Sequence, residues 1–396
     1  MPLYVYTFFD DLVLLYPVYA LLFTQTGLSV GQISALFACW SLSSLALEVP
    51  SGALADTVSR RMLLWIGPLL AAAGFALWVC APSFWAFACG FVLWGTKGAL
   101  GSGALEALIY EELDRIGSAA RYGQVMGRAK AAGTAGTVLA MGAAAPVLAA
   151  GGYLAVGAAT VVACLLTAAT ATTFPEHRGP APGGGTPVED DADDLGWAAT
   201  LRAGLAEARH HRAVRSAVLL VVAVSAVWGA LDEYTPLLIS ATGVPDATVP
   251  LLLLLIWTAV ALGGLATGWA ERLRTPGFAV LLVLAAAALA AGALSGRPAG
   301  IVLVAMAFAA FQAADVVAGA RLQERVTGPA RATVTSVAGM ATDLATTGVY
   351  GIYALLSGLA GHSGAFALLA VPYLVVALWL PVARRRPSVD IDSRIG

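Results

Sequence analysis

Between residues 52 and 61 the sequence reads Gly52-Ala53-Leu54-Ala55-Asp56-Thr57-Val58-Ser59-Arg60-Arg61, a short polar loop between two apolar segments. The flanking segments, residues 30–49 and 62–80, each have about 20 residues, which is the length that crosses a bilayer as a helix. The loop carries one acid followed by two bases. Loops rich in Lys and Arg stay on the cytoplasmic side of a membrane. This stretch therefore predicts a cytoplasmic turn between two membrane spans.

Ten further apolar segments fill most of the chain. The chain is 59% apolar and 12% charged, with a mean hydropathy of +0.81. A water-soluble domain has about twice that charged fraction, so a soluble fold is excluded. Membrane spans of this kind must be helices, because lipid cannot satisfy backbone amides. We predict an all-α polytopic membrane protein with twelve transmembrane helices near residues 3–24, 30–49, 62–80, 84–108, 124–148, 152–173, 214–240, 247–270, 277–295, 299–321, 332–357 and 364–382.

The distribution of positive charge gives the expected orientation. If both chain ends are cytoplasmic, all of the 22 Lys and Arg residues except Arg297 and Lys97 fall on the cytoplasmic side. This bias predicts a multi-pass protein of the cell inner (plasma) membrane with cytoplasmic N- and C-termini. The first residues, Met1-Pro2-Leu3, have no basic region, and we therefore expect no removable signal.

The composition changes in the middle of the chain. Residues 175–195 are rich in Pro, Gly and acid, as in a solvated linker. The following stretch, residues 197–215, has helical spacing of apolar residues and predicts an interfacial helix. We predict four parts: an N-terminal six-helix bundle at 1–174, a cytoplasmic linker with the interfacial helix at 175–213, a C-terminal six-helix bundle at 214–385 and a cytoplasmic tail at 386–396.

The two bundles are expected to be internal repeats. A shift of 216 positions aligns Thr26-Gly27 with Thr242-Gly243. A shift of 210 aligns Asp114-Arg115-Ile116 with Glu324-Arg325-Val326. A six-helix unit repeated in one orientation predicts two pseudo-symmetric bundles, with a ligand site between them and alternating access as the mechanism.

The quoted loop resembles the signature G-x-L-A-D-R-x-G-R-K of the major facilitator superfamily (MFS), which also lies between spans two and three. Thr57 and Ser59 depart from that pattern. The resemblance implies a gating role for Gly52, Asp56, Arg60 and Arg61, with Asp56 set against the start of span eleven just after Arg331. An ordinary positively charged turn is the alternative interpretation.

Span four carries Lys97-Gly98-Ala99-Leu100-Gly101-Ser102-Gly103-Ala104, which resembles the R-x-x-Q-G-x-G-A pattern of the same family. A lone cation in mid-membrane costs about 2.5–3.5 kcal/mol unless it is paired or hydrated. We therefore expect Lys97 to pair across helices, with span one as the candidate, either for transport or as a structural ion pair. The segments Glu48-Val49-Pro50-Ser51-Gly52 and 104–110 resemble the prokaryotic multidrug-efflux-like branch, whereas the fifth-helix antiporter pattern is misspaced.

Carboxylates within spans mark ion or substrate paths by default. Adjacent acids repel, so we expect one member of Asp10/Asp11 and of Asp232/Glu233 to hold a proton near neutral pH. Glu106 lies near a helix end, where a structural role is equally open, and each aromatic residue is also explained by packing. The candidate substrate and proton residues are Asp10, Asp11, Tyr16, Lys97, Glu106, Trp228, Asp232, Glu233, Gln312, Asp315 and Asp343.

Other activities lack their motifs. No phosphate-binding G-x-x-x-x-G-K-[ST] loop is present, and the four cysteines have no CxxC spacing. Gly361-His362-Ser363-Gly364 matches the string of an intramembrane serine protease, but we interpret it as an external turn, because no histidine lies inside a span. We expect no enzymatic activity, no cofactor, no metal site and no nucleic-acid partner.

These observations predict an MFS secondary transporter that works by alternating access. We expect a monomer in the lipid bilayer that binds a small-molecule substrate, with protons as the coupling ion and efflux of a small amphiphilic compound as the direction. An uptake symporter of a small metabolite is the alternative within transport. A non-transporting receptor or membrane enzyme is the alternative outside it.

Overall fold

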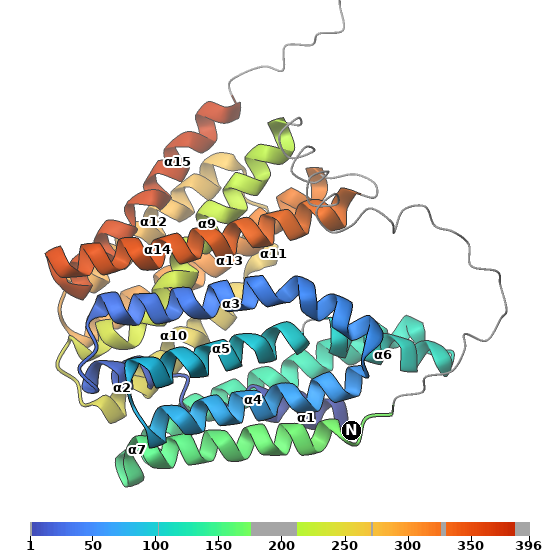
Figure 1. Cartoon of the computed structure of the whole chain (residues 1–396). Helices are drawn as coiled ribbons and strands as arrows, with labels where there is room; N and C mark the ends of the chain where they lie inside the picture. The colour runs from blue at the N-terminus through green and yellow to red at the C-terminus, as the bar shows by residue number, and fades with distance from the viewer. Residues whose placement is uncertain (1, 102, 176–211, 271, 326–329, 385–396) are drawn as a thin grey trace, which may run out of the picture.

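The computed structural model describes residues 2–101, 103–175, 212–270, 272–325 and 330–384, without the side chains of 48–57, 212–213, 269, 330–333 and 381–384. In this part of the chain every regular element is a helix (Figure 1). The first half contains α1 (Pro2–Asp10), α2 (Tyr19–Gln25), α3 (Val30–Thr57), α4 (Arg60–Cys80), α5 (Phe84–Gly101), α6 (Ala104–Arg115), η1 (Ala119–Arg121) and α7 (Tyr122–Ala171).

The second half begins at Arg212. It contains α9 (Arg212–Ser240), η2 (Asp246–Thr248), α10 (Val249–Leu265), α11 (Thr267–Ala270), α12 (Thr275–Leu294), η3 (Pro298–Gly300), α13 (Ile301–Arg325), α14 (Ala330–Leu369) and α15 (Val371–Arg384). The predicted linker and most of the predicted interfacial helix fall at 176–211, outside the described residues.

Eight helical stretches of the described chain are long and apolar enough to cross a membrane. Two of these stretches each contain two crossings, because a glycine with positive φ joins two helices within them. These glycines are Gly152 (φ 64°) in α7 and Gly361 (φ 67°) in α14. The remaining crossings are α1 with α2 and α5 with α6. The described residues therefore form the twelve crossings that the sequence predicts.

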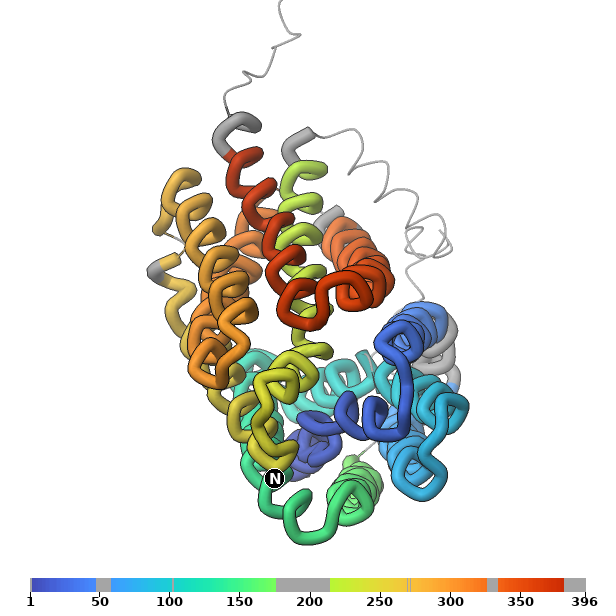
Figure 2. Tube along the Cα trace, turned by 90° about the vertical axis from the view of Figure 1, so that its left-hand side faces the viewer, coloured from blue at the N-terminus to red at the C-terminus, as the bar shows by residue number. Residues whose placement is uncertain are grey.

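The two halves repeat one packing scheme (Figure 2). In the first half α3 and α4 pack on α5, and α1 packs on α7. At the equivalent positions α10 and α12 pack on α13, and α9 packs on α14. The turn glycines Gly27 (φ 88°) and Gly243 (φ 82°), which the internal alignment superposes, both have the left-handed conformation. The fold is that of two pseudo-symmetric helical bundles.

The turns define two ends of the molecule. We call the end with turns 26–29, 81–83, 241–248 and 295–300 the closed end, because side chains of the two halves hydrogen-bond there. The opposite end, with turns 58–59, 116–121 and 272–274, is called the linker end. The closed end is on the left in Figure 1, and α3 of the first half contacts α14 of the second half between the two ends.

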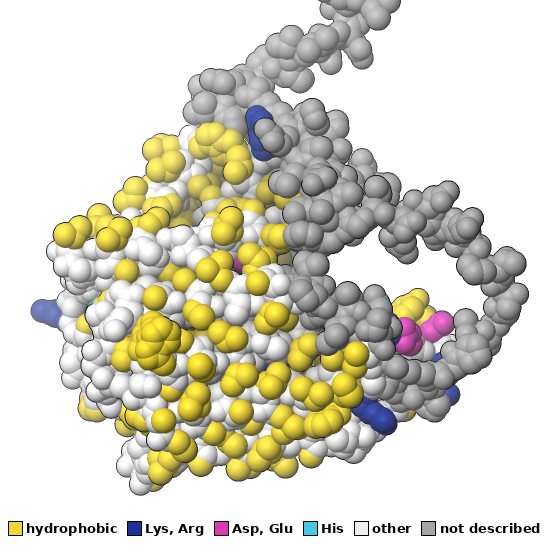
Figure 3. Space-filling view, in the orientation of Figure 1, with side chains coloured by type: hydrophobic (Ala, Val, Ile, Leu, Met, Phe, Trp, Pro, Cys, Tyr) yellow, Lys and Arg dark blue, Asp and Glu magenta, His cyan; other side chains and the backbone are white. Residues whose placement is uncertain are grey.

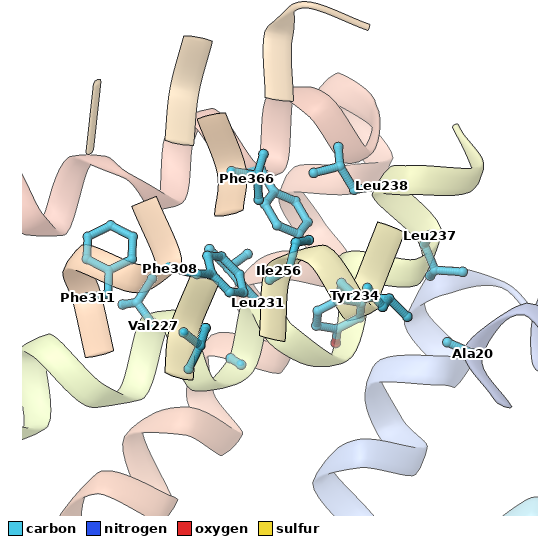
Figure 4. Packing of buried hydrophobic residues seen from close by; sticks show 14 of the residues in the cluster. Ala20, Val227, Leu231, Tyr234, Leu237, Leu238, Ile256, Phe308, Phe311 and Phe366 are labelled. Atoms are coloured by element: carbon cyan, nitrogen blue, oxygen red, sulfur yellow. The ribbon is translucent and has the colours of Figure 1, made fainter. Parts of the chain in front are cut away.

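The outer surface is apolar and the interior is aromatic. Leu265 and Leu359 are 82% and 86% exposed, as expected for side chains that face lipid, and apolar side chains cover much of the face in Figure 3. The closed end is filled by rings, and Figure 4 shows Tyr234 and Leu237 of α9 close to Ala20 of α2. The buried ring cluster of the first half comprises Tyr19, Phe23, Phe37, Trp78, Phe87 and Phe91.

Span one is not the single helix that the sequence predicts. Helix α1 ends at Asp10 and α2 begins at Tyr19, with irregular backbone between them. Pro17 contributes to the break, because it has no amide to donate. The amide of Leu15 instead donates to the side chain of Thr160 in α7, at 3.0 Å.

Three other spans are also interrupted. Span four breaks between α5 and α6, where Gly103 has φ 73°. Span eight breaks at Ala266, between α10 and α11, where the Thr267 hydroxyl bonds to the Gly264 carbonyl at 2.5 Å. Span twelve breaks at Ala370, just before Pro372, whose ring cannot donate a helical hydrogen bond.

Candidate functional site

Lys97 of α5 forms an ion pair with Asp10 at the end of α1. The distance from Lys97 Nζ to Asp10 Oδ1 is 2.8 Å, and the two side chains are 18% and 24% exposed. Gly67 of α4 makes room for the lysine, since a Cβ at that position would lie 3.3 Å from Lys97 Cγ. The pairing of Lys97 with span one, which the sequence predicts from the cost of an isolated cation, is present.

The ion pair lies in the wall of a cavity of about 170 Å³. The cavity lies inside the first half, between α1, α4 and the junction of α5 with α6. Apart from the two charges its lining is apolar or aromatic. It consists of Tyr6, Asp10, Leu63, Leu64, Gly67, Pro68, Lys97, Gly98, Gly101 and Leu105. The site therefore has a charged side chain beside a space that could hold an apolar group of a ligand.

Asp11 faces a different helix from Asp10. Its Oδ2 atom contacts the position that a Cβ of Gly133 in α7 would occupy. Lys130, one turn earlier on α7, also interacts electrostatically with Asp11. Asp10 thus contacts α5, whereas Asp11 lies against α7 and also interacts electrostatically with Lys97.

Asp232 and Glu233 lie where the two halves meet. The hydroxyl of Tyr19 in α2 donates a hydrogen bond to Glu233 Oε2, and Glu233 is only 7% exposed. A space of about 10 Å³ remains beside them, which is room for about one water molecule. It is lined by Tyr16, Pro17, Tyr19, Met141, Asp232, Glu233, Pro236, Leu253 and Trp257.

Three more hydrogen bonds join the halves among the described residues. Ser34 Oγ lies 2.6 Å from Tyr234 Oη, Ser41 Oγ lies 2.9 Å from Thr347 Oγ1, and Gln25 Nε2 donates to Asp246 Oδ2 at 2.5 Å. These bonds, with the one from Tyr19, span the closed end and reach along α3 as far as Ser41. Asp343 lies one turn from Thr347 on α14, toward the linker end, and is exposed.

The second half holds a smaller polar cluster. Ser225 of α9 donates to Asp315 Oδ1 of α13, and the ring of Trp228 packs edge-on against Phe308. Gln312 is half-buried one turn from Asp315 on α13. The indole nitrogen of Trp228 is buried and has no hydrogen-bond partner among the described residues.

The remaining predicted residues lie apart from these groups. Glu106 is exposed in the first turn of α6. Arg60 forms an ion pair with Glu111 of α6, and Arg61 donates to the carbonyl of Phe174 at 3.2 Å. The side chains of Asp56 and Arg331 lie outside the described residues. The gating roles of Gly52, Asp56, Arg60, Arg61 and Arg331 stay predictions.

The sequence did not single out several residues that pack beside Tyr16 or join distant segments. Trp40 and Trp94 stack at 5.1 Å, and Trp94 also contacts the ring of Tyr16. Ser34, Ser41 and Thr160 make buried or half-buried contacts between distant segments. Trp94 has one signal in the sequence, because it precedes Lys97 by nearly one helical turn.

Two pseudo-symmetric bundles of transmembrane helices, with charged and aromatic side chains where they meet, define a class of membrane transporters. The sequence matches the family model of the Major Facilitator Superfamily over residues 3–295. The chain belongs to the Major Facilitator Superfamily and is a multi-pass membrane transporter. No curated protein matches it.

Solved structures share this fold over nearly the whole chain. The nucleoside transporter NupG has a TM-score of 0.77 at 13% identity, with 98% of this chain and 99% of that chain covered. A D-xylose–proton symporter has a TM-score of 0.67 at 16% identity, with 96% and 95% covered. A bacterial homologue of the human lysosomal transporter Spinster, inward-facing and unoccupied, has a TM-score of 0.65 at 18% identity, with 96% and 93% covered. At these identities the likeness concerns the fold.

Proposed function

We propose that this transporter exports a small cationic amphiphile in exchange for protons, by alternating access between its two halves. The observation that carries the proposal is the Lys97–Asp10 ion pair, set in the wall of a cavity whose other side chains are apolar or aromatic. The pair is the only contact between an ammonium and a carboxylate among the described residues of the spans. The multidrug-efflux-like branch that the sequence resembles is consistent with this substrate class.

The ion pair supplies a chemical route to exchange. When the ammonium group of a substrate binds Asp10, it displaces the ammonium group of Lys97. A buried charge without a partner is costly, and a lysine can relieve that cost by releasing its proton. Binding one monovalent cation therefore releases one proton, and the net charge of the site is conserved.

An anionic substrate would give the opposite result. It would bind Lys97 and leave Asp10 unpaired, so that Asp10 would take up a proton. Substrate and proton would then enter the site together, as in a symporter. The sign of the proton movement thus distinguishes export by exchange from proton-coupled uptake.

The apolar and aromatic side chains beside the ion pair support an amphiphile. A cavity of about 150 Å³ accommodates benzene in an engineered protein, and the space beside Lys97 is about 170 Å³. A single ring or a compact alkyl group attached to the cation fits this volume. The other candidate residues have supporting roles in this proposal: Asp11, Asp315 and Asp343 as further proton sites, and Asp232 with Glu233 at the contact that must open.

Charge also supports the proposed orientation. The described basic residues of the loops gather at the linker end, among them Arg60, Arg115, Arg121 and Arg274, whereas Arg297 lies at the closed end. By the positive-inside rule this distribution supports a linker end in the cytoplasm. We propose that the protein is a monomer in the plasma membrane.

The test uses purified protein in liposomes that contain a pH-sensitive dye. Benzyltrimethylammonium is added outside as the probe, because it is a permanent cation with one ring. Exchange predicts that the lumen becomes alkaline as protons leave. Lys97→Met should remove the signal, and Glu112→Gln, which changes a carboxylate at the exposed Arg115 ion pair, should retain it.

Two outcomes would contradict the proposal. Acidification of the lumen on addition of benzenesulfonate, a permanent anion that does not itself carry protons across the bilayer, without a response to the cation, would support the symporter. The absence of any proton movement with either probe, in protein that binds neither of them, would reject proton exchange at this ion pair.

A further inference from the structure

The interruption of span one lies in the interior of the protein, where its backbone is buried and hydrogen-bonded. Residues Val13, Leu14, Leu15 and Val18 lie between α1 and α2 and are all buried. Short turns replace the helix here: the Tyr16 amide donates to the Val13 carbonyl at 3.1 Å, and the Val18 amide donates to the Leu15 carbonyl at 3.0 Å. Irregular backbone at membrane depth is tolerated only where protein or enclosed water satisfies its polar groups.

Thr160 satisfies one of these groups. The Leu15 amide donates to Thr160 Oγ1 at 3.0 Å, and the hydroxyl of Thr160 donates to the Val156 carbonyl at 3.0 Å. One hydroxyl thus accepts from span one and donates within its own helix. Leu15 and Thr160 are both fully buried, so water cannot take the place of the hydroxyl.

The hydrogen bond from Leu15 to Thr160, called the tie below, lies along the chain between two contacts that the proposed function uses. Asp10, on the α1 side of the break, pairs with Lys97. Tyr19, on the α2 side, bonds to Glu233 of the other half. Leu15 lies near the middle of the segment that separates them. Its amide bonds to Thr160 of α7, and its carbonyl accepts from the amide of Tyr19, the first residue of α2, at 2.8 Å.

The two short helices are held by different groups. Helix α1 lies close against α7, where a Cβ at Gly136 would meet the backbone carbonyl of Phe8. Helix α2 is held by rings, since Phe23 packs at 4.3 Å from Phe87. The path of the backbone between the two helices is therefore set by the turns and by the bond to Thr160.

We propose that Thr160 is a positioning residue of the transport cycle. Its hydroxyl accepts from the Leu15 amide and so fixes the path of the backbone at the break in span one. That path determines where Asp10, with its ion pair to Lys97, lies relative to Tyr19, with its bond to Glu233. The transport part of this inference rests on the proposed function. The structural part, that the hydroxyl holds the break, stands independently of it.

The chain offers a matched control. Thr167 lies on the same helix, is also fully buried, and donates to the Ala163 carbonyl at 2.9 Å. Among the described residues its hydroxyl makes no bond to another helix. Thr160→Val and Thr167→Val thus remove the same group from the same helix, and only the first removes an acceptor from span one.

The first measurement is hydrogen–deuterium exchange of the peptide that covers residues 11–18, in protein embedded in nanodiscs. Loss of one buried hydrogen bond predicts exchange faster by roughly fivefold in Thr160→Val. Thr160→Ser should restore the slow exchange, and Thr167→Val should match the wild type. Thr160→Ala serves if the valine variant does not fold. Unchanged exchange in the folded valine or alanine variant would overturn the proposal.

The second measurement separates the two proposals. With benzyltrimethylammonium as the probe, Thr160→Val should lower the maximal rate of proton exchange at least fivefold relative to the wild type. The cation concentration that gives half the maximal rate should stay within about twofold of the wild-type value. Faster backbone exchange with an unchanged transport rate would reject the role in transport. A wild type that transports no probe, together with the predicted backbone exchange, would reject the proposed function and retain the tie.

Discussion

The hydroxyl of Tyr19 donates a hydrogen bond to the carboxylate of Glu233 across the contact between the two halves of the protein. Both residues are almost completely buried. A state that opens the closed end must break this bond, and the stability of that end therefore depends on it.

Tyr19→Phe should loosen the closed end. The substitution leaves a buried carboxylate without its donor, at a cost of about 1–3 kcal/mol. We expect a cysteine at Met141, which lines the small space beside Glu233, to react about fivefold or more faster with an impermeant thiol reagent, in a background without the native cysteines. Tyr16→Phe is the control, because Tyr16 lines the same space. Equal labelling rates in the two variants would contradict this prediction.

Changes to the ion pair should separate stability from transport. Lys97→Met or Asp10→Asn alone leaves one buried charge unpaired, and we expect each to destabilise the fold by about 2 kcal/mol, less than the 3–5 kcal/mol of a fully buried pair because both side chains are partly exposed. The double variant should recover most of that loss in thermal unfolding but remain inactive in proton exchange. A double variant as unstable as the single ones would mean that the pair is held by other contacts.

Gly98→Ala and Gly101→Ala should reduce the cavity without strain. Both glycines line the cavity, and a Cβ on either would meet nothing within 4 Å. Alanine favours a helix over glycine by about 0.5–1 kcal/mol, so the melting temperature should stay the same or rise. Binding of benzyltrimethylammonium should weaken relative to tetramethylammonium, as measured by calorimetry. Gly142→Ala, which also meets open space but lies away from the cavity, should leave both affinities unchanged.

Gly136→Ala should be strongly destabilising. A Cβ there would overlap the carbonyl oxygen of Phe8, which is backbone and cannot move aside without shifting α1. Such overpacking costs about 1–3 kcal/mol. The melting temperature of this variant should fall clearly below that of Gly142→Ala, and similar values for the two would show that α1 shifts at little cost.

The twelve crossings follow from the sequence because length and hydropathy are local properties of each segment. The interruptions do not. The break in span one has the same apolar composition as the helices beside it, and the hydroxyl that stabilises it lies 145 residues away. Gly103 is a similar case, because a glycine is compatible with both a continuous helix and a turn.

The candidate site was predictable where a charge demands a partner. Lys97 in a span required a carboxylate nearby, and Asp10 is that carboxylate. The sequence could not assign neighbours to Asp10 and Asp11, because it does not show which helices pack on each side of span one. Neutral contacts such as Ser34 with Tyr234 were missed altogether, since a serine in an apolar helix carries no comparable cost.

The buried indole nitrogen of Trp228 gives this conformation an energetic bias. A donor without an acceptor costs about 1–3 kcal/mol, which corresponds to roughly five- to 150-fold in a population. Any alternative arrangement of α9, or any bound compound, that offers an oxygen to this N–H group is favoured by that amount. The unpaired N–H group of Trp228 therefore lowers the free-energy difference between the described conformation and any state that pairs it.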